Sequence, residues 1–354
     1  MKPSKSNTAA NITIKNISEA ELSGPRLLLS KLKNELFNRK KSDIELKRAS
    51  IKPKRQKNYK KLLSVIICTS GRNSLALNAI NSVINQDFSS EKYEIIVVNN
   101  SRENFCGEFF EQNIRIVNEP VQGLSRARNT GADSAGGEYL LYMDDDALAC
   151  ENLLLNMFKA FEKHPGCAII GGQIFLKLPT PNPNVFLKGR EAIWSGYTVP
   201  YKKFKEVGEQ YEFPYGACFG IRHSALDGFG GFPEDYGRCG NDFAGGEETA
   251  LCFMAKNSRL KIGIEPSAAV WHVVSADRFT KEHIRETIRA GILTTYRLYA
   301  EGYSKCGWTN DYIDERIKII TGELARLQRN KEFLAYFYKK CELDAFYEVK
   351  SMIL

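Results

Sequence analysis

From residue 62 onward, short apolar runs alternate with segments whose apolar residues recur at helical spacing, a pattern typical of parallel α/β proteins. The first run, LLSVIIC at residues 62–68, is rich in β-branched residues and is followed by Thr69, Ser70 and Gly71. Strands are predicted at 62–68, 93–99, 114–120 and in the run GGEYLLYM before residue 144, and helices at 74–86, 125–134 and 151–163. In this order the ends of the first, second and fourth strands meet at one sheet edge, where open parallel sheets bind ligands.

The second half of the chain is less regular. Five prolines and several aromatic residues lie in residues 177–215, which predicts a long excursion over that sheet edge. Strands are predicted in the runs CAIIGGQI and KIGIEPSAAVWHV. Residues 281–301 and 311–340 are predicted to form two long amphipathic helices.

The N-terminal part of the chain differs from the rest in charge. Residues 1–61 contain 17 lysines and arginines against 5 acidic residues, a net of +12, whereas residues 62–354 have a net of −4. Residues 1–24 are polar and are expected to be disordered. Residues 25–61 begin with a possible amphipathic helix, which could lie on an anionic membrane surface or dock on a partner. Equally, this helix could pack on the protein body and lead into a solvated basic linker.

Charge and cysteine content exclude several classes of protein. Because the basicity lies in the arm, the folded body is not expected to bind nucleic acid. The nine cysteines are scattered and contain no CxxC pair, so a disulfide framework or a zinc knuckle is not expected and a reducing cytosol fits best. No run approaches eighteen apolar residues, and the N-terminus lacks the apolar core of a secretory signal. We therefore expect a cytoplasmic protein, either soluble or peripheral on the inner face of the membrane.

Three consecutive aspartates, Asp144, Asp145 and Asp146, follow the fourth predicted strand. Carboxylates at such close spacing repel one another and ionise readily only beside a strong cation, so a divalent metal is a natural partner. Hard oxygen ligands favour Mg or Mn. A solvated turn would explain the same residues, because Asp favours turns.

Two other loops face the same predicted edge. The loop Thr69-Ser70-Gly71-Arg72-Asn73 lacks the GxGxxG spacing of a dinucleotide site, which disfavours a nicotinamide enzyme. It offers hydroxyls, a glycine and a cation, which suit a base and a phosphate; a helix N-cap with a surface arginine would explain it equally well. In the run GLSRARNTG, Arg126 and Arg128 point to different sides of a helix, so one could reach an anionic diphosphate while the other stays in solvent.

Six segments carry a resemblance to a known family. In order, they read SVIICTSGRN, EIIVVNNS, GLSRARNTGADSAGGEYLLYMDDDAL, YGACFGIR, GGEETAL and VWH. In these segments the chain resembles the family 2 glycosyltransferases, which are inverting enzymes with the GT-A fold. The resemblance spans residues 62–275 and implies a mostly parallel central sheet flanked by helices, with a basic N-terminal arm before it and C-terminal helices at 276–354. Residues 62–150 would form its nucleotide-binding half and residues 151–275 its acceptor-binding half.

The resemblance implies a site for a nucleotide-diphosphate sugar. Asp144 and Asp146 match the outer residues of the family's DxD motif, where one contacts the ribose or metal and the last coordinates a divalent metal that bridges both phosphates. Arg128 matches an arginine near the nucleotide. Thr69 and Asn99 match positions that hold the base, although Asn99 replaces the usual Asp and so leaves the nucleotide open. The other residues expected to bind the donor are Ser70, Arg72 and Asp145.

On the acceptor side, Gly216 and Ala217 match a small-residue turn that lets the donor sugar lie close to the backbone. Glu247 and Glu248 match the family's ED pair, in which the second residue is usually Asp. A direct displacement needs one carboxylate to deprotonate the attacking hydroxyl. Glu248 aligns with the usual base and Glu247 is the alternative. An acidic helix start would explain the pair as well.

His272 follows a buried strand, where many family members place a third metal ligand. Without the family pattern, a lone histidine at such a position is more often structural. Trp194, Tyr215 and Trp271 could stack on sugars or pack in the core.

These observations predict an inverting glycosyltransferase in which a metal and Arg128 neutralise the departing nucleoside diphosphate while a glutamate deprotonates the acceptor. The acceptor could be a saccharide, a lipid-linked glycan, a protein or a small molecule; bacterial polysaccharide or glycoconjugate assembly suits both the family and the basic arm. Two other classes stay open. A sugar nucleotidyltransferase would usually carry a Gly-rich basic first loop, and a catalytically silent carbohydrate-binding relative would usually have lost its carboxylates.

Overall fold

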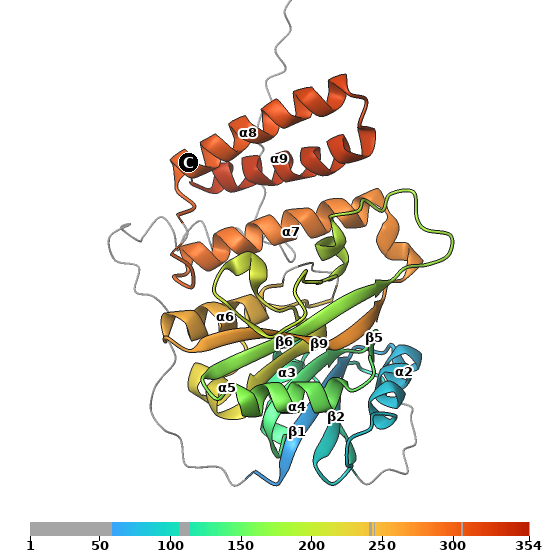
Figure 1. The fold of residues 1–354 in the computed structure, drawn as a ribbon. Coiled ribbons are helices and arrows are strands. Elements are labelled where there is room, and N and C mark those ends of the chain that lie inside the picture. The colour runs from blue at the N-terminus through green and yellow to red at the C-terminus, as the bar shows by residue number, and fades with distance from the viewer. Residues whose placement is uncertain (1–58, 106–112, 241–242, 244, 306, 354) are drawn as a thin grey trace, which may run out of the picture.

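A computed structural model describes residues 59–105, 113–240, 243, 245–305 and 307–353 (Figure 1). Almost all of the predicted basic arm, including the expected amphipathic helix, lies outside these residues. Among the described residues, no helix combines the length and the apolar character needed to cross a membrane.

The core of the protein is one sheet of nine described strands, in the order β3-β2-β1-β4-β8-β6-β9-β5, with β7 paired to β9. The strands are β1 Lys61–Thr69, β2 Tyr93–Asn99, β3 Ile114–Asn118, β4 Gly137–Asp144, β5 Ala147–Ala149, β6 Cys167–Lys177, β7 Lys205–Val207, β8 Phe219–Arg222 and β9 Lys261–Val273. Strands β3, β2, β1 and β4 pair in parallel, and β6 and β9 continue in the same direction. Only β5, β7 and β8 run the opposite way. The mostly parallel α/β sheet expected from the sequence is thus confirmed.

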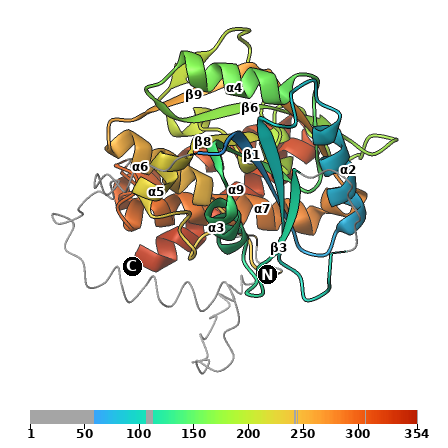
Figure 2. The same ribbon diagram turned by 90° about the horizontal axis from the view of Figure 1, so that it is seen from below.

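Helices cover both faces of this sheet, as the apolar strands require. They are α2 Asn73–Ile84, α3 Leu124–Ser134, α4 Leu153–Lys163, α5 His223–Phe229, α6 Glu247–Asn257, α7 Lys281–Ala300, α8 Asn310–Arg329 and α9 Phe333–Ile353. Helices α2 and α3 lie on opposite sides of β1, β2 and β3, and α4 lies along β6 and β9 (Figure 2). The segment after β6 is the predicted excursion, and it contains only short elements, among them the 3-10 turns η2 Glu191–Trp194 and η4 Gly216–Cys218.

The prediction of one long helix over residues 311–340 is wrong. Helix α8 ends at Arg329, Lys331 takes a left-handed φ of 58°, and α9 starts at Phe333. The chain folds back because both helices carry apolar residues that pack into one cluster with α7, which a single straight helix could not bury. This cluster includes Tyr296 and Ala300 of α7, Ile317 and Ile320 of α8, and Phe346 and Val349 of α9. In the sequence, only Asn330 marks the break as a weak helix former, and the residues on either side of it favour a continuous helix.

Helix α7 lies between the sheet and the α8–α9 pair (Figure 1) and contacts described residues that precede α6. Arg297 of α7 stacks on Tyr236 at 4.1 Å from the ring centroid and donates to the Asp235 carbonyl oxygen at 2.6 Å. The Tyr236 hydroxyl donates to Glu301 at 3.1 Å. A Cβ on Gly246, directly before α6, would lie 2.5 Å from Thr294 Cγ2. The start of α6 is therefore braced by α7.

Helix α3 packs closely on the sheet at Gly131. A Cβ at this position would lie 2.5 Å from Ile66 Cγ2 on β1 and 3.2 Å from Val98 Cγ2 on β2. We expect Gly131→Ala to lower the free energy of unfolding by about 1–3 kcal/mol through overpacking, measured by urea denaturation. The matched control is Gly291→Ala in α7, where a Cβ would meet nothing within 4 Å. Alanine there should stabilise the helix by up to about 1 kcal/mol, and equal effects at both sites would contradict the close packing.

Candidate active site

The register of the parallel strands brings the predicted site residues to one edge. Thr69 at the end of β1 pairs with Asn99 at the end of β2, and Cys68 pairs with Asp144 at the end of β4. These strands end together, as the sequence predicted. The three aspartates that begin with the last residue of β4 thus lie beside the loop that begins at Ser70.

A second strand pairing brings His272 to the aspartates. Strand β5 begins directly after Asp146 and pairs antiparallel with β9, with Ala147 opposite His272. The backbone N–H of Val273 donates to the Asp146 carbonyl oxygen at 2.8 Å. Ligand atoms of Asp144, Asp146 and His272 consequently lie within 4.8 Å of one another.

The His272 ring is oriented to offer a nitrogen to this cluster. Its Nδ1 lies 2.8 Å from the Trp194 carbonyl oxygen and donates to it, so in the neutral ring Nε2 carries a lone pair. Nε2 lies 3.0 Å from Asp146 Oδ1, an oxygen that accepts no hydrogen bond from any other described residue. A carbonyl that fixes the far nitrogen is the usual support of a metal-binding histidine. Two aspartates and this histidine therefore fit a divalent metal such as Mn or Mg.

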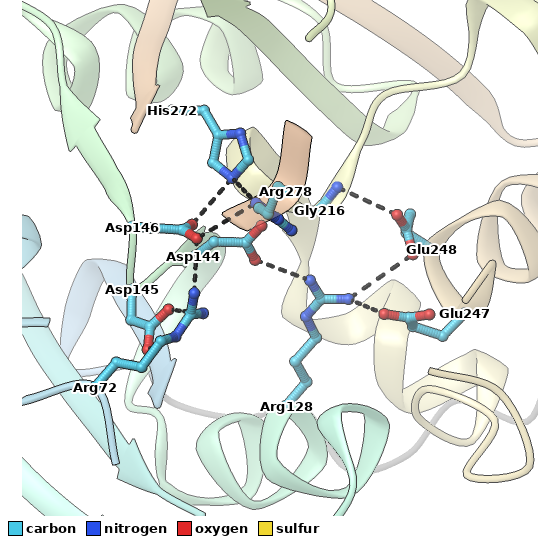
Figure 3. Close-up of polar contacts among 10 residues, drawn as sticks. All are labelled: Arg72, Arg128, Asp144, Asp145, Asp146, Gly216, Glu247, Glu248, His272 and Arg278. Carbon is cyan, nitrogen blue, oxygen red and sulfur yellow. Dashed lines mark hydrogen bonds and ion pairs between the residues drawn. The ribbon is translucent and has the colours of Figure 1, made fainter. Parts of the chain in front are cut away.

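Two arginines lie against the same carboxylates (Figure 3). Arg72 pairs with Asp145 and reaches Asp146 Oδ2 at 2.8 Å, and Arg278 lies 3.7 Å from that oxygen. Burial works to raise the pKa of Asp146, but His272 and the two arginines outweigh it and hold the pKa well below its usual range. For Asp145 burial prevails over Arg72 and raises the pKa to about 7.

Arg278 was not among the predicted site residues. It lies on the 3-10 turn η5 Ala276–Phe279, six positions after His272. A single arginine after a strand gives no signal in the sequence, because nothing local links it to the distant aspartates. Only the placement of β9 beside β5 reveals the contact.

A second cluster surrounds Arg128, which is 4% exposed. Its Nη1 lies 2.5 Å from Glu247 Oε1 and 3.8 Å from Glu248 Oε2. Burial works to lower the pKa of Arg128, but the charges of Glu247, Glu248 and Asp144 raise it above its ordinary value. The Gly216 N–H donates to Glu248 Oε1 at 3.3 Å. A Cβ on Gly216 would collide with the Arg128 guanidinium, which explains a glycine there.

The two glutamates differ in their surroundings. Both lie in the first turn of α6, where the helix dipole favours carboxylates. Glu247 is 3% exposed and forms the short ion pair with Arg128, whereas Glu248 is 17% exposed and lies 3.8 Å from Arg128. In each glutamate, Oε2 accepts no hydrogen bond from the described residues. Burial, followed by the charge of Glu247, raises the pKa of Glu248 to about 8.

Asp144 joins the two clusters. Its Oδ1 lies 3.4 Å from Arg128 Nη2, and the side chain is 29% exposed. In Figure 3 the aspartates and His272 lie on one side of this contact and the glutamates on the other. The candidate metal ligands and the candidate base thus border one region.

The remaining predicted residues have simpler surroundings. Ser70 is exposed and Ala217 is buried. Asn99 pins the turn after β2, because its Nδ2 donates to the Glu103 carbonyl at 2.8 Å and its Oδ1 accepts from Ser101 Oγ at 2.9 Å. Arg126 points away from the site to Glu234, as its spacing from Arg128 predicted. Trp194 is 1% exposed and stacks on Phe279, so it packs in the core.

Known proteins share this architecture. A mannosyltransferase, PcManGT from Pyrobaculum calidifontis, solved with GDP-Man and Mn²⁺, superposes with a TM-score of 0.51 and 14% identity, covering 92% of this chain and 94% of that chain. At this identity the likeness shows the fold alone. The chain thus has a GT-A-type fold.

Residues 64–230 match the model described as glycosyl transferase family 2, and this part of the chain is a glycosyltransferase domain of that family. A glucosyl-dolichyl phosphate glucuronosyltransferase of Haloferax volcanii is 23% identical over 196 residues, which cover 54% of this chain and 62% of that protein. The minor teichoic acid biosynthesis protein GgaB of Bacillus subtilis is 30% identical over 116 residues, 31% of this chain and 13% of that protein. In both cases the matched part is less than two thirds of the relative's length.

Proposed function

We propose that this chain is a metal-dependent, inverting glycosyltransferase that moves a sugar from a nucleoside diphosphate to an acceptor hydroxyl. The observation that carries this proposal is the pair of clusters joined at Asp144. One cluster contains ligand atoms suited to a divalent metal, and the other contains a carboxylate with a raised pKa. A donor diphosphate on the first cluster would place its sugar toward the second.

The metal would be held by Asp144, Asp146 and His272. When bound, it supplies positive charge that stabilises the departing diphosphate. Mn and Mg both fit a set of two carboxylates and one imidazole. Thr69, Ser70 and Asn99 lie at the edge where the base would bind, and the turn at Gly216 and Ala217 would let the sugar approach the backbone.

Glu248 is the better candidate for the base. Its side chain is more exposed than that of Glu247, and it lies 3.8 Å from Arg128 and does not form the short ion pair that engages Glu247. In the reaction, the acceptor O–H proton passes to Glu248 while the acceptor oxygen forms a bond to the anomeric carbon. The bond from that carbon to the diphosphate oxygen breaks, and its electron pair leaves with the nucleoside diphosphate. Glu247 would hold Arg128 in place.

The names of the relatives guide the choice of acceptor class. One relative is named for teichoic acid biosynthesis and one for transfer to a glucosyl-dolichyl phosphate. We therefore favour a saccharide or lipid-linked acceptor in polysaccharide or glycoconjugate assembly, over a protein or a small molecule. Residues 62–150 would bind the nucleotide, and residues 151–275 the acceptor. Contact of residues 25–61 with an anionic membrane is part of this proposal, and vesicle binding with and without those residues would test it.

The donor site can be tested by thermal unfolding with UDP, GDP, dTDP and CDP, each with and without Mn²⁺. A ligand that binds only the folded state stabilises it by about 2.7 kcal/mol at a hundred times its Kd. We expect a Mn²⁺-dependent rise in Tm with one nucleotide, and its loss in Asp146→Asn, which removes one charge from the metal ligands. Asp344→Asn on the exposed side of α9 is the control and should respond like the wild type. No rise with any of the four nucleotides would instead favour a silent relative.

A further inference from the structure

The candidate metal ligands already have cations beside them. The Arg72 guanidinium lies 2.8 Å from Asp146 Oδ2, and Arg278 Nη1 lies 3.7 Å from the same oxygen. Arg278 Nη1 also lies 3.4 Å from His272 Nε2, the nitrogen that a metal would use. Figure 3 shows both side chains converging on Asp146 from different elements.

These arginines compete with a metal because they occupy the space beside Asp146 and already neutralise its negative charge. Arginine stays protonated in proteins, so it cannot yield by losing its charge. Asp145 and Asp146 face the two guanidinium groups, so these four side chains have no net formal charge when both carboxylates are ionised. A divalent cation alone would add an excess of two positive charges, which an anionic diphosphate would offset. The metal and the diphosphate should therefore assist each other.

Arg278 is held where such an exchange is possible. Its side chain is 13% exposed, and its backbone carbonyl accepts the Trp194 Nε1–H at 3.1 Å. Trp194 also supplies the carbonyl oxygen that orients His272. The backbone of η5 is thereby tied to the support of the candidate ligand, while the guanidinium lies at the end of a flexible side chain. A guanidinium fork can leave one carboxylate and take two phosphate oxygens.

We propose that Arg72 and Arg278 form a cation clamp, which holds Asp146 before loading and passes to the donor's diphosphate when a metal takes that carboxylate. This clamp rests on the proposed function. It makes Arg278 a ligand for the nucleoside diphosphate and makes metal and nucleotide binding mutually dependent. Each would bind weakly without the other.

The test is a pair of affinities measured on Arg278→Gln and Arg72→Gln. Titration of Mn²⁺ alone, followed by electron paramagnetic resonance, should show tighter binding in each variant, because a competing cation is gone. Calorimetric titration of UDP and of GDP at saturating Mn²⁺ should show binding weaker by about 10- to 100-fold for the cognate nucleotide, the range expected for losing a hydrogen bond to a charged group. Opposite signs for the two affinities are the signature of the clamp.

Arg329→Gln is the control, because it removes the same charge from an exposed position in the last turn of α8. Both of its affinities should match the wild type. Arg72 is 48% exposed, so its replacement should disturb folding less than that of Arg278. Arg72→Gln therefore still tests the clamp if Arg278→Gln does not fold. Affinities that both fall, or that both stay unchanged, would overturn the clamp while the proposed function stands. A wild type that binds neither Mn²⁺ nor nucleotide would overturn the proposed function first.

Discussion

Replacing Glu248 by glutamine is expected to lower the rate of sugar transfer by about 10²- to 10⁴-fold, the usual contribution of a positioned general base. Glutamine keeps the size of the side chain and leaves the Arg128–Glu247 pair in place, so Mn²⁺-dependent nucleotide binding should be nearly unchanged. The measurement is kcat for transfer, together with the nucleotide-induced rise in Tm. A loss of both would assign Glu248 to donor binding instead.

The raised pKa of Glu248 gives this residue a pH dependence with a definite sign. A base must be ionised, so kcat/KM of the wild type should rise with pH up to about 8, the pKa of this carboxyl. The free energy of unfolding should change with pH in the opposite direction. Because the pKa is raised from 4.5 to about 8 by folding, the folded state binds more protons between these values, and stability falls as pH rises through them. Glu248→Gln has no carboxyl to titrate at this position. The Tm of the variant relative to that of the wild type should therefore increase between pH 5 and 8.

Two further variants separate the glutamates. Glu248→Asp restores the residue that the family usually carries but withdraws the carboxylate by one methylene, so transfer should fall less than in Glu248→Gln. Glu247→Gln should chiefly destabilise the protein, because Arg128 loses its short ion pair. If Glu247→Gln instead abolishes transfer with its stability intact, and Glu248→Gln does not, then the base is Glu247.

Replacing Arg128 by methionine should lower the free energy of unfolding by about 3–5 kcal/mol, measured by urea denaturation. The loss is large because Glu247, which is 3% exposed, would be left without its partner. The double variant Arg128→Met/Glu247→Gln removes both charges. It should be more stable than the two single losses would predict, by about 0.5–3 kcal/mol.

Arg126 provides a matched control two residues away on the same helix. It pairs with Glu234 at 2.5 Å, the same distance as the Arg128–Glu247 pair, but the two side chains are 41% and 46% exposed. Exposed pairs contribute little, so Arg126→Met should change stability by less than about 1 kcal/mol. Similar losses at both positions would show that burial is not what makes Arg128 important.

The sequence predicted the features that depend on residues close together in the chain. The β-branched run at residues 62–68 predicted β1 to within a residue at each end. Because parallel strands end together, the ends of the predicted strands also placed Thr69, Asn99 and Asp144 at one edge of the sheet. The spacing of Arg126 and Arg128 predicted that they point to different sides of a helix, and the family resemblance assigned Arg128 to the site. The contribution of His272 and the glutamates came from the family resemblance, since their residue types alone are equally consistent with structural roles.

The features that the sequence did not predict depend on contacts between distant segments. Strand β5 has only three residues, yet its pairing with β9 brings His272 to Asp146. Strand β8 lies antiparallel between β4 and β6, which brings the turn at Gly216 beside Arg128. The break after Arg329 is decided by how α8 and α9 pack together. Asn330 after the basic residues of the last turn is a weak local sign of a helix end, but the good helix formers on either side of it favour a continuous helix.

The contacts between α7 and the residues before α6 limit where the chain can be truncated. A boundary near residue 275 separates a region rich in motifs from one without them, and it is an obvious place to truncate the protein for study. A fragment ending there would lack Arg278, the Arg297 contacts to Asp235 and Tyr236, and the Thr294 contact beside Gly246. The glutamates at the start of α6 would lose their support on one side. The motif-poor C-terminal segment is thus part of the scaffold that sets the geometry of the motifs.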